Sequence, residues 1–560
     1  MTASPTPVFS ALRPPDTVMR LSRMGAAHQT RLSFLRVLIR CMRDEGWRIA
    51  NTSFAIDVNG VGTAIYCVDT GPRRYSLVAF GHELAAEKRT DRVIAEEWDA
   101  TFVLYDGLPD QTEIERLRAN VPLQESGRYL GSELVLARAN RSVRLFDAVV
   151  SGLAKGRQPD TAAIETTGYL MRTTAVYGNG KFGIADRDRI KSRPELRGPF
   201  RAEMLTVYLI RLFTLDLVEH LARLEGGDKA VPLAPPLRRR LGIGNATGLG
   251  MAPFLVKHPA LIDQWVTARE MALARVRGLA AASKTAVAVF REVLARSPAL
   301  LANWLTDDEK QKECIARLRE DLARLEAFAD DRVLLGAYPF DAIYRFAERN
   351  LALEAQEYVV SLLLEPHGAL IDDLADRMEI DENASFRIDG RMSCGELRRL
   401  IGECYGFALA LDFSQKDALA RFWYVSEEKL EPRLGERFLE PGAEREQPVA
   451  VARDVAALAH ALDAEPSHAP LGLFLIAHPE HRHSVRRVQI TCRHPYAEIR
   501  DNLTDAGLRA IDILRCKLAF FGATRFDPRS DRWLRISLFQ GAPFPDELAA
   551  EGSDLWAYGA

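Results

Sequence analysis

The chain of 560 residues is 47% hydrophobic and 27% charged, and its formal net charge is −3. This composition is typical of a soluble globular protein, and the length exceeds what one ordinary hydrophobic core holds, which predicts several domains. The near-neutral charge argues against a general nucleic-acid-binding protein, which would carry a basic face or domain.

The longest strongly apolar stretch, MLTVYLIRLFTLDLVEHL from Met204, is interrupted by Arg211 and Asp216. It predicts a buried helix and not a membrane span, which needs about 18 or more apolar residues in a row. The first residues lack the charged and apolar regions of a signal peptide. Seven cysteines lie far apart without a CxxC pair. We therefore expect a cytoplasmic protein with no membrane partner and no structural disulfide.

Residues 1–50 are predicted to hold an N-terminal segment and one amphipathic helix, whose apolar residues recur at spacings of three and four up to the stop at Gly46. Arg36, Arg40 and Arg43 share another face of this helix. We expect that face to be solvated, with an acidic partner surface as the alternative.

Residues 51–110 change to a period of two, which predicts a small α+β unit. Three strands are expected in SFAIDVNG, GTAIYCVDTG and RRYSLVAFG, with turns at NGVG and DTGP. A helix at about 84–98 and a fourth strand in ATFVLYDG complete the unit.

Residues 111–435 are predicted to form a mainly helical core region with glycine-rich loops at 177–183 and 226–250. The expected helices cover residues 200–224, 259–282, 284–297, 308–328, 340–364 and 394–411. Residues 449–560 are predicted as a C-terminal α+β unit with a helix at 449–463, a hairpin at 471–492, a helix at 497–521 and a strand at 532–541. The expected fold class is α+β and α-rich, with a large helical centre flanked by smaller mixed units.

The stretch RRRLGIGNATGLGMAPFLVKH, residues 238–258, predicts an anion site. Glycines ahead of a helix starting near Ala252 or Pro253 would let backbone N–H groups approach a phosphate or carboxylate. The expected binding residues are Arg240, Gly242, Gly244, Asn245, Thr247 and Gly248, with His258 as an acid or base. The stretch lacks GKS or GKT and is not preceded by a hydrophobic strand, so it matches neither nucleotide fingerprint. The alternative is a tight loop whose glycines serve packing.

Two further segments carry candidate residues. MRTTAVYGNGKFG predicts a second glycine loop, in which Arg172 and Asn179 would bind a ligand and Tyr177 and Lys181 would take part in catalysis. RFWYVSEEKLEPR predicts Glu428 as a base and Arg433 as an anion clamp, with a surface ion-pair network as the alternative. The two glycine loops could converge on one ligand, or each could be a solvent-exposed turn.

Six of the eleven histidines lie between 460 and 494, and HPEHRH brings three of them together. At the tip of a hairpin their side chains would splay into water, so we expect no metal site.

These patterns favour a soluble enzyme, of the lyase, isomerase or hydrolase type, that acts on a small anionic metabolite by general acid–base chemistry. The cofactor is not identified, and a nucleotide or flavin phosphate could occupy the same glycine loop. The alternative is a non-catalytic helical scaffold. Twofold dimers are the commonest assembly, which leads us to expect a homo-oligomer, a dimer first.

Overall fold

The structure is a computed structural model. It describes residues 12–24, 28–89, 97–121, 130–178, 181–182, 192–247, 259–378, 386–412, 422–426, 432–434, 443–448, 451–499, 512, 514–530 and 533–559. Side chains are not described for residues 21, 174–178, 181–182, 246–247, 407–408, 422–426, 432–434, 443–448, 528–530 and 533.

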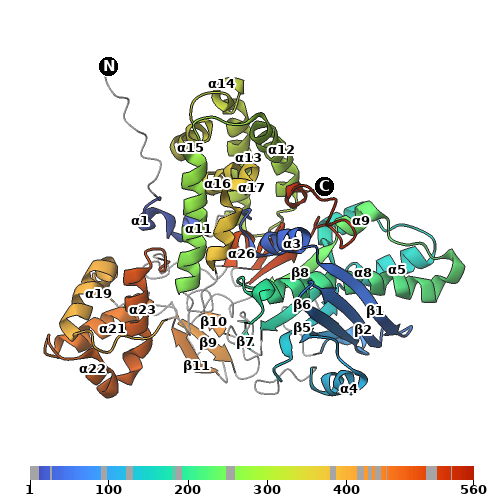
Figure 1. The fold of residues 1–560 in the computed structure, drawn as a ribbon, viewed down its shortest axis with the longest axis horizontal. Coiled ribbons are helices and arrows are strands. Elements are labelled where there is room, and N and C mark those ends of the chain that lie inside the picture. Colours follow the sequence, from blue (N-terminus) through green and yellow to red (C-terminus); the bar gives the residue numbers. More distant parts are fainter. Residues whose placement is uncertain are drawn as a thin grey trace.

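One large sheet organises the chain (Figure 1). Its strand order is β1-β2-β3-β4-β5-β6-β8-β13-β12, with β7 paired to β6. The bounds are β1 Arg48–Ile56, β2 Gly62–Asp69, β3 Arg74–Gly81, β4 Ala100–Asp106, β5 Glu133–Arg141, β6 Tyr169–Gly178, β7 Lys181–Phe182, β8 Gly242–Thr247, β12 Arg525–Ser530 and β13 Trp533–Leu538. Neighbouring strands are antiparallel except β6 and β8, which are parallel.

The four strands expected in residues 51–110 are confirmed as β1 to β4. Their turns use glycine as expected: Gly60 and Gly71 have φ of +80° and +90°, values that glycine adopts readily. Asp57 accepts hydrogen bonds from the backbone N–H groups of Asn59 and Val61 and so closes the first turn. Of the expected helix at about 84–98, the described residues form only the short 3₁₀ turn η1, Ala86–Lys88, and the rest lies outside them.

Residues 111–435 hold strands that we had not expected. β5, β6 and β8 continue the sheet through this region. β5 is buried along almost its whole length because helices cover both faces of the sheet there. A strand buried on both faces has few alternating polar residues, and periodicity alone does not separate such an apolar run from a segment of buried helix.

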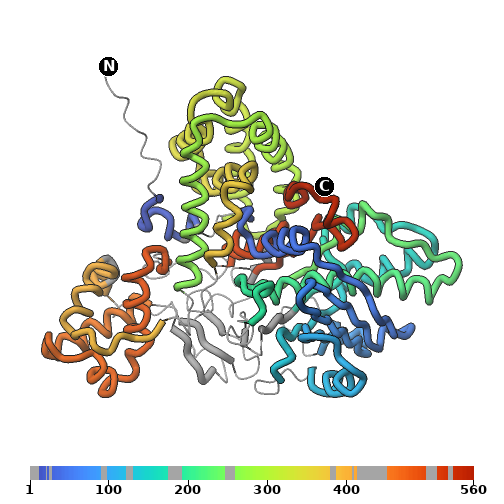
Figure 2. The backbone as a smooth tube through the Cα atoms, viewed as in Figure 1, coloured from blue at the N-terminus to red at the C-terminus, as the bar shows by residue number. Residues whose placement is uncertain are grey.

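The predicted long helices are confirmed, except that the segment 340–364 holds two helices and not one. The helix expected at 200–224 is α8, Arg201–Gly226, which packs on β3 to β6 and β8. The helices that follow form a bundle beside the sheet (Figures 1 and 2). They are α11 Pro259–Arg277, α12 Lys284–Ala302, α13 Glu309–Phe328, α14 Asp331–Leu334, α15 Pro339–Asn350, α16 Leu353–Leu364 and α17 Gly368–Ile371. The helix expected at 340–364 is therefore two helices, α15 and α16.

The other helices of the N-terminal half of the chain are shorter. They are α1 Pro15–Val18, α2 Leu21–Met24, α3 Phe34–Asp44, α4 Gln111–Asn120, α5 Phe146–Ala154, α6 Thr161–Thr167 and α9 Pro235–Arg239. α4 buries Ile114 and Leu117 against one face of β3 to β5, whereas α5 packs on α8 on the other face. The central strands are thus enclosed between helices.

The hairpin expected at 471–492 is wrong. This segment forms α22, Leu471–Ala477, and α23, Arg482–Arg493, joined by a 3₁₀ turn. Leu471 and Phe474 are buried three residues apart, which is the spacing of a helix face. These helices lie together with α19, Cys394–Leu409, and α21, Val451–Asp463. The group is drawn in orange in Figure 1.

The rest of the C-terminal region is mixed. β9 Phe422–Ser426, β10 Pro432–Leu434 and β11 Ala443–Pro448 form a three-stranded sheet in the order β10-β9-β11. The strand expected at 532–541 is confirmed as β13. Of the helix expected at 497–521, Ala497–Ile499 are not helical, α26 covers Cys516–Phe521, and most of the remainder lies outside the described residues.

The arginine face of α3 is not solvated. The side chains of Arg36 and Arg40 are buried and pair with Glu365, next to α16, and with Asp554 near the C-terminus. The Arg40 Nη1 to Asp554 Oδ2 distance is 2.5 Å. The acidic surface that we had considered as an alternative therefore belongs to the same chain.

The α+β, α-rich fold class is confirmed, with one qualification about its parts. β1 to β4 from residues 51–110 and β12 and β13 from residues 449–560 belong to the same sheet. The division into four ranges stays a prediction. Within the described part of the chain, no helix combines the length and apolar character needed to cross a bilayer.

Candidate functional site

The two glycine-rich segments leave the large sheet at the same edge. β6 and β8 run parallel, with Tyr169 opposite Gly242 and Thr173 opposite Asn245. Residues 242–247 are therefore a central strand, and the expectation of a loop there is wrong. Because the two strands are parallel, their carboxyl ends point the same way.

Gly242 and Gly244 are explained by packing within the chain. A Cβ atom on Gly244 would lie 2.7 Å from the ring of Tyr169, and one on Gly242 would lie 2.4 Å from the carbonyl oxygen of Leu538. Contacts this short are not tolerated, so both positions require glycine whether or not a ligand binds. The packing alternative considered for this stretch accounts for these two residues.

The three arginines before β8 contact carboxylates of the chain. Arg239 pairs with Glu547 and Glu551 at 2.6 and 3.0 Å, and Arg240 pairs with Glu165 at 2.5 Å. Arg240 also precedes the amino end of β8, whereas Gly248 follows its carboxyl end. A single loop that grips an anion with Arg240 and Gly248 is therefore not formed, since a strand of six residues separates them.

Arg172 and Asn245 lie on opposite faces of the sheet. Arg172 is opposite Gly244 and 3% exposed, and neighbouring residues of a strand point to opposite faces. Asn245 shares its face with Thr173. Of the candidate residues, the structure thus brings Asn245 together with Thr173 and places Arg172 on the other side.

The remaining candidates are described only in part. The backbones of Tyr177, Lys181, Thr247 and Arg433 lie in β6, β7, β8 and β10, in that order. Asn179, Gly248, His258 and Glu428 lie outside the described residues. Their assigned roles stay predictions.

Sequence reasoning missed Lys517, which the structure places against Asn245. The Lys517 Nζ donates a hydrogen bond to Asn245 Oδ1 at 2.7 Å. Asn245 Nδ2 in turn donates to Thr173 Oγ1 at 2.9 Å, and the Thr173 hydroxyl donates to the carbonyl oxygen of Gly244 at 3.2 Å. This chain of donors fixes the orientation of the Asn245 amide, so its oxygen faces the amine.

Lys517 is unusual in its surroundings. Its side chain is 2% exposed, it lies 4.8 Å from the ring centre of Phe521, and no carboxylate among the described residues pairs with it. Burial lowers the pKa of the Lys517 amine to about 7. A substantial fraction of this amine is therefore neutral near pH 7, and a neutral amine is a base and a nucleophile.

One sequence signal could have found this residue. Lys517 lies in RCKLAFF, where it interrupts an otherwise apolar run. A lone lysine on a helix whose neighbours are all buried either extends its amine to water or keeps it buried near neutral charge. The sequence alone does not separate these outcomes, because Asn245, which meets the amine, is 272 residues away.

The histidine cluster lies between α22 and α23. His478 and His481 pack on Phe474, with ring centres 4.9 and 5.8 Å from it, and His478 contacts Glu480. No group of three His, Cys, Asp or Glu side chains suited to a metal is found in the described ranges. The expectation of no metal site stays a prediction.

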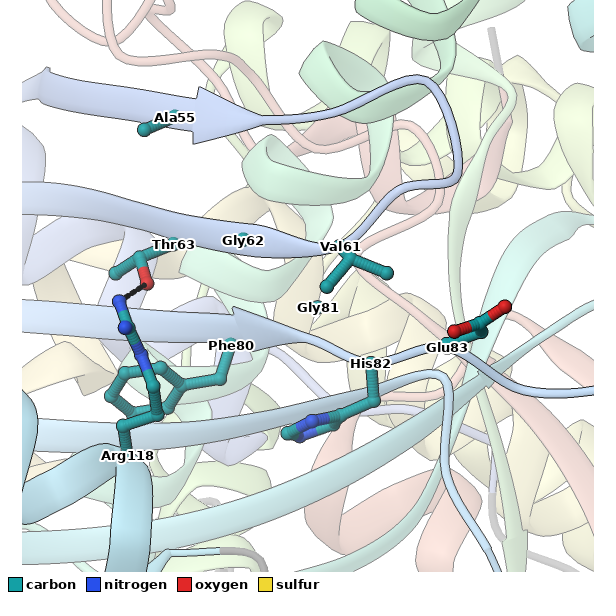
Figure 3. Close-up of a pocket in the computed structure, with 9 residues that line it drawn as sticks. All are labelled: Ala55, Val61, Gly62, Thr63, Phe80, Gly81, His82, Glu83 and Arg118. Carbon is teal, nitrogen blue, oxygen red and sulfur yellow. Dashed lines mark hydrogen bonds between the residues drawn. The ribbon is translucent and has the colours of Figure 1, made fainter.

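A surface pocket lies at the far end of the sheet, between β2, β3 and α4 (Figure 3). Its volume is about 320 Å³. Arg118 reaches across it to Thr63, with 2.7 Å between Nη2 and Oγ1, and the His82 ring bonds to Thr101. Arg118, Thr63 and His82 are thus engaged within the chain, and none of our candidate residues lines the pocket.

Asn245, Thr173 and Lys517 therefore form the candidate functional site. Thr173 and Asn245 face each other within the paired part of the parallel strands β6 and β8, and Lys517 meets them from α26. No protein-family model, curated protein or solved structure matches this chain.

Proposed function

We propose that the protein is an enzyme that acts on a small anionic metabolite by general acid–base chemistry, with Lys517 as the base. One observation carries the proposal: a buried amine, with its pKa near neutrality, bonds only to a neutral amide among its described partners. Such an amine is matched to proton transfer at neutral pH.

The anionic character of the substrate follows from charge balance. When the neutral amine accepts a proton it becomes a buried ammonium ion, which is costly without a counter-ion. The described residues supply only the Asn245 carbonyl oxygen and the Phe521 ring. A carboxylate or phosphate on the substrate would provide the missing negative charge, and Asn245 would keep the amine aimed at the reacting atom.

The chemistry is that of an isomerase, lyase or hydrolase. A neutral Lys517 would remove a proton from a carbon next to a carbonyl or carboxyl group, or from a water molecule. The resulting ammonium group would return the proton to the product. Each reaction needs only an amine that cycles between two protonation states.

The test is proton exchange with solvent, which does not require the full reaction to be known. Small carboxylic and phosphorylated metabolites are incubated with the protein in D₂O, and loss of C–H signals is followed by NMR. We expect the wild-type protein to exchange a proton of at least one compound. Lys517→Met should lose the exchange by at least 100-fold, the scale of a general base.

Lys310→Met is the matched control, because Lys310 is exposed on α13 and should leave exchange unchanged. If no compound in a broad panel exchanges above the rate in buffer, the proposal fails. It also fails if Lys517→Met exchanges as fast as the wild type.

A non-catalytic interaction protein is the second candidate, and α22 favours it. Leu473 and Ile476 of this helix are 64% and 80% exposed, so the helix presents a small apolar surface. Under this candidate, Lys517→Met would leave partner binding intact, whereas Ile476→Asp would abolish it. A nucleotide or flavin held by residues 242–250 gains no support, since 242–247 form a strand. The dimeric state and cytoplasmic location stay proposals.

A further inference from the structure

Two cysteine thiols meet where α19 packs on α23. The Sγ atoms of Cys404 and Cys492 are 3.2 Å apart, and one thiol donates a hydrogen bond to the other. Both side chains are only partly buried, so small oxidants can reach them. These residues are 88 positions apart in the sequence, and their contact is a product of the fold.

The neighbouring residues hold the two helices in register. The hydroxyl of Tyr405, which follows Cys404, lies 2.9 Å from the hydroxyl of Thr491, which precedes Cys492. The same tyrosine hydroxyl donates to Glu498 at 2.9 Å, and Arg487 of α23 clamps that carboxylate with bonds of 2.5 and 2.6 Å. The thiols are therefore kept in contact by buried polar bonds on one side of them.

We propose that Cys404 and Cys492 are an oxidative modification site that forms a reversible disulfide with hydrogen peroxide or an organic hydroperoxide. The sulfur of one thiolate attacks the peroxide oxygen and breaks the O–O bond, and the proton from the thiol goes to the leaving oxygen. This step gives a sulfenic acid and releases water from hydrogen peroxide or an alcohol from an organic hydroperoxide. The second thiol then attacks the oxidised sulfur, the S–S bond forms, and the sulfenic oxygen leaves as water. Two thiols lose two electrons, and the peroxide gains them.

The reaction should be selective and slow. The bond between the thiols, together with burial, raises the pKa of Cys492 well above its usual range, and the thiolate is the attacking form. Selectivity comes instead from proximity, because a sulfenic acid on either residue has its resolving thiol already in contact.

A covalent link here would change the mobility of a defined part of the chain. Residues 404–492 include α21, α22 and the strands β9 to β11. Oxidation would close this segment into a loop and fasten α19 to α23. A cross-link of this kind restricts the unfolded chain and raises the melting temperature.

The test uses the full-length protein treated with hydrogen peroxide, followed by alkylation of the remaining thiols and mass spectrometry. We expect two fewer alkylated cysteines than in the reduced protein, a Cys404–Cys492 cross-linked peptide and a melting temperature several degrees higher. Dithiothreitol should reverse all three changes.

Cys404→Ser and Cys492→Ser should each abolish the cross-link and the shift, while Cys314→Ser, on α13, should keep both. A disulfide between other cysteines, a disulfide between chains, or single-residue oxidation without the Cys404–Cys492 peptide would overturn the proposal. Because the readouts are mass and melting temperature, the result does not depend on whether Lys517 is catalytic.

Discussion

Lys517 is expected to weaken the fold that holds it. Its folded pKa of about 7 lies below the usual value of an unfolded lysine, near 10.4, so the unfolded chain binds the proton more tightly. This difference corresponds to a cost of about 4 to 5 kcal/mol when both states are protonated. Retaining such a residue is consistent with a functional role, since active sites often reduce stability.

Lys517→Met should therefore stabilise the protein. The cost of burying the amine is fully present below pH 7 and disappears as pH rises toward about 10, where both states are neutral. After allowing for the lost bond to Asn245, we expect a gain in the free energy of unfolding of roughly 2 kcal/mol at pH 7. Urea denaturation at pH 7 and pH 10 measures it. A variant less stable than the wild type at pH 7 would contradict the assignment.

Asn245→Asp should move the titration of Lys517 upward. A carboxylate 2.7 Å from the amine favours the ammonium form and raises its pKa by about 1 to 3 units. Less neutral amine is then present at pH 7, so any exchange activity should fall there and recover at higher pH. A pH profile of the exchange rate checks this shift. Asn245→Ser, which adds no charge, should lower the rate without moving the profile upward.

Arg240→Ala and Gly244→Val separate packing from anion binding. Arg240 and Glu165 form a partly exposed pair, so Arg240→Ala should change stability by only about 0.2 to 1 kcal/mol. Gly244→Val places a branched side chain against the Tyr169 ring and should cost about 1 to 3 kcal/mol. Melting curves with and without phosphate measure both. If phosphate raises the melting temperature of the wild type and of Gly244→Val but not of Arg240→Ala, the result would support an anion site at the amino end of β8.

At the scale of elements, α3 depends on its buried ion pairs. Removing the guanidinium of Arg36 would leave Glu365 buried and reduce the charge opposing Asp554. We expect Arg36→Met to destabilise the protein by about 3 to 5 kcal/mol. Arg43→Met, on the same helix, is the control, because Arg43 is more exposed and pairs with the neighbouring Asp44. Equal losses in the two variants by urea denaturation would contradict this account.

The elements predicted well from sequence are those with a clear local pattern. β1 to β4 are short alternating or apolar runs bounded by glycine-containing turns, and the helices α8, α11, α12 and α13 repeat apolar residues at helical spacing. β8 was not recognised, since GIGNAT contains glycines that packing requires and its faces are both covered. α22 was mistaken for a strand because LGLFLIA is a short apolar run, which periodicity alone cannot assign.

The candidate site was predictable only in part. Asn245 was singled out from a glycine-rich stretch, but for the wrong local structure. Lys517 and Thr173 could not be paired with it, because three distant segments meet there through the topology of the sheet. The burial of Arg36 and Arg40 was hidden for the same reason: their carboxylate partners lie more than 300 residues away.

At the scale of the whole molecule, buried ion pairs join the N-terminal segment to the helical bundle. Arg13 binds Glu270 and Glu357 at 2.7 and 2.8 Å, and Arg36 and Arg40 bind Glu365 and Asp554. Although burial opposes ionisation, Arg13 and Arg269 hold the pKa of Glu357 at about 2. Arg40 and Arg36 likewise hold the pKa of Asp554 below its usual range.

These carboxylates should make the protein acid-labile. Their folded pKa values are depressed, so their contribution is fully present above about pH 5 and is lost as pH falls through about 4 toward 2. Thermal melts between pH 7 and pH 3 should show a steep fall below pH 5. Added salt should change the midpoint little at neutral pH, because buried pairs are poorly screened. A melting temperature independent of pH over this range would contradict the prediction.

The position of β8 in the sheet also bears on how the protein is made. Its neighbour β6 is synthesised before it, but its other neighbour, β13, begins roughly 290 residues later in the chain. A ribosome that adds about 5 to 20 residues per second needs roughly 15 to 60 s to cover that distance. Throughout this interval the nascent chain carries a strand whose second partner does not yet exist, and an unpaired strand edge is a template for aggregation. Cells that produce this protein should therefore depend on chaperones that act during translation.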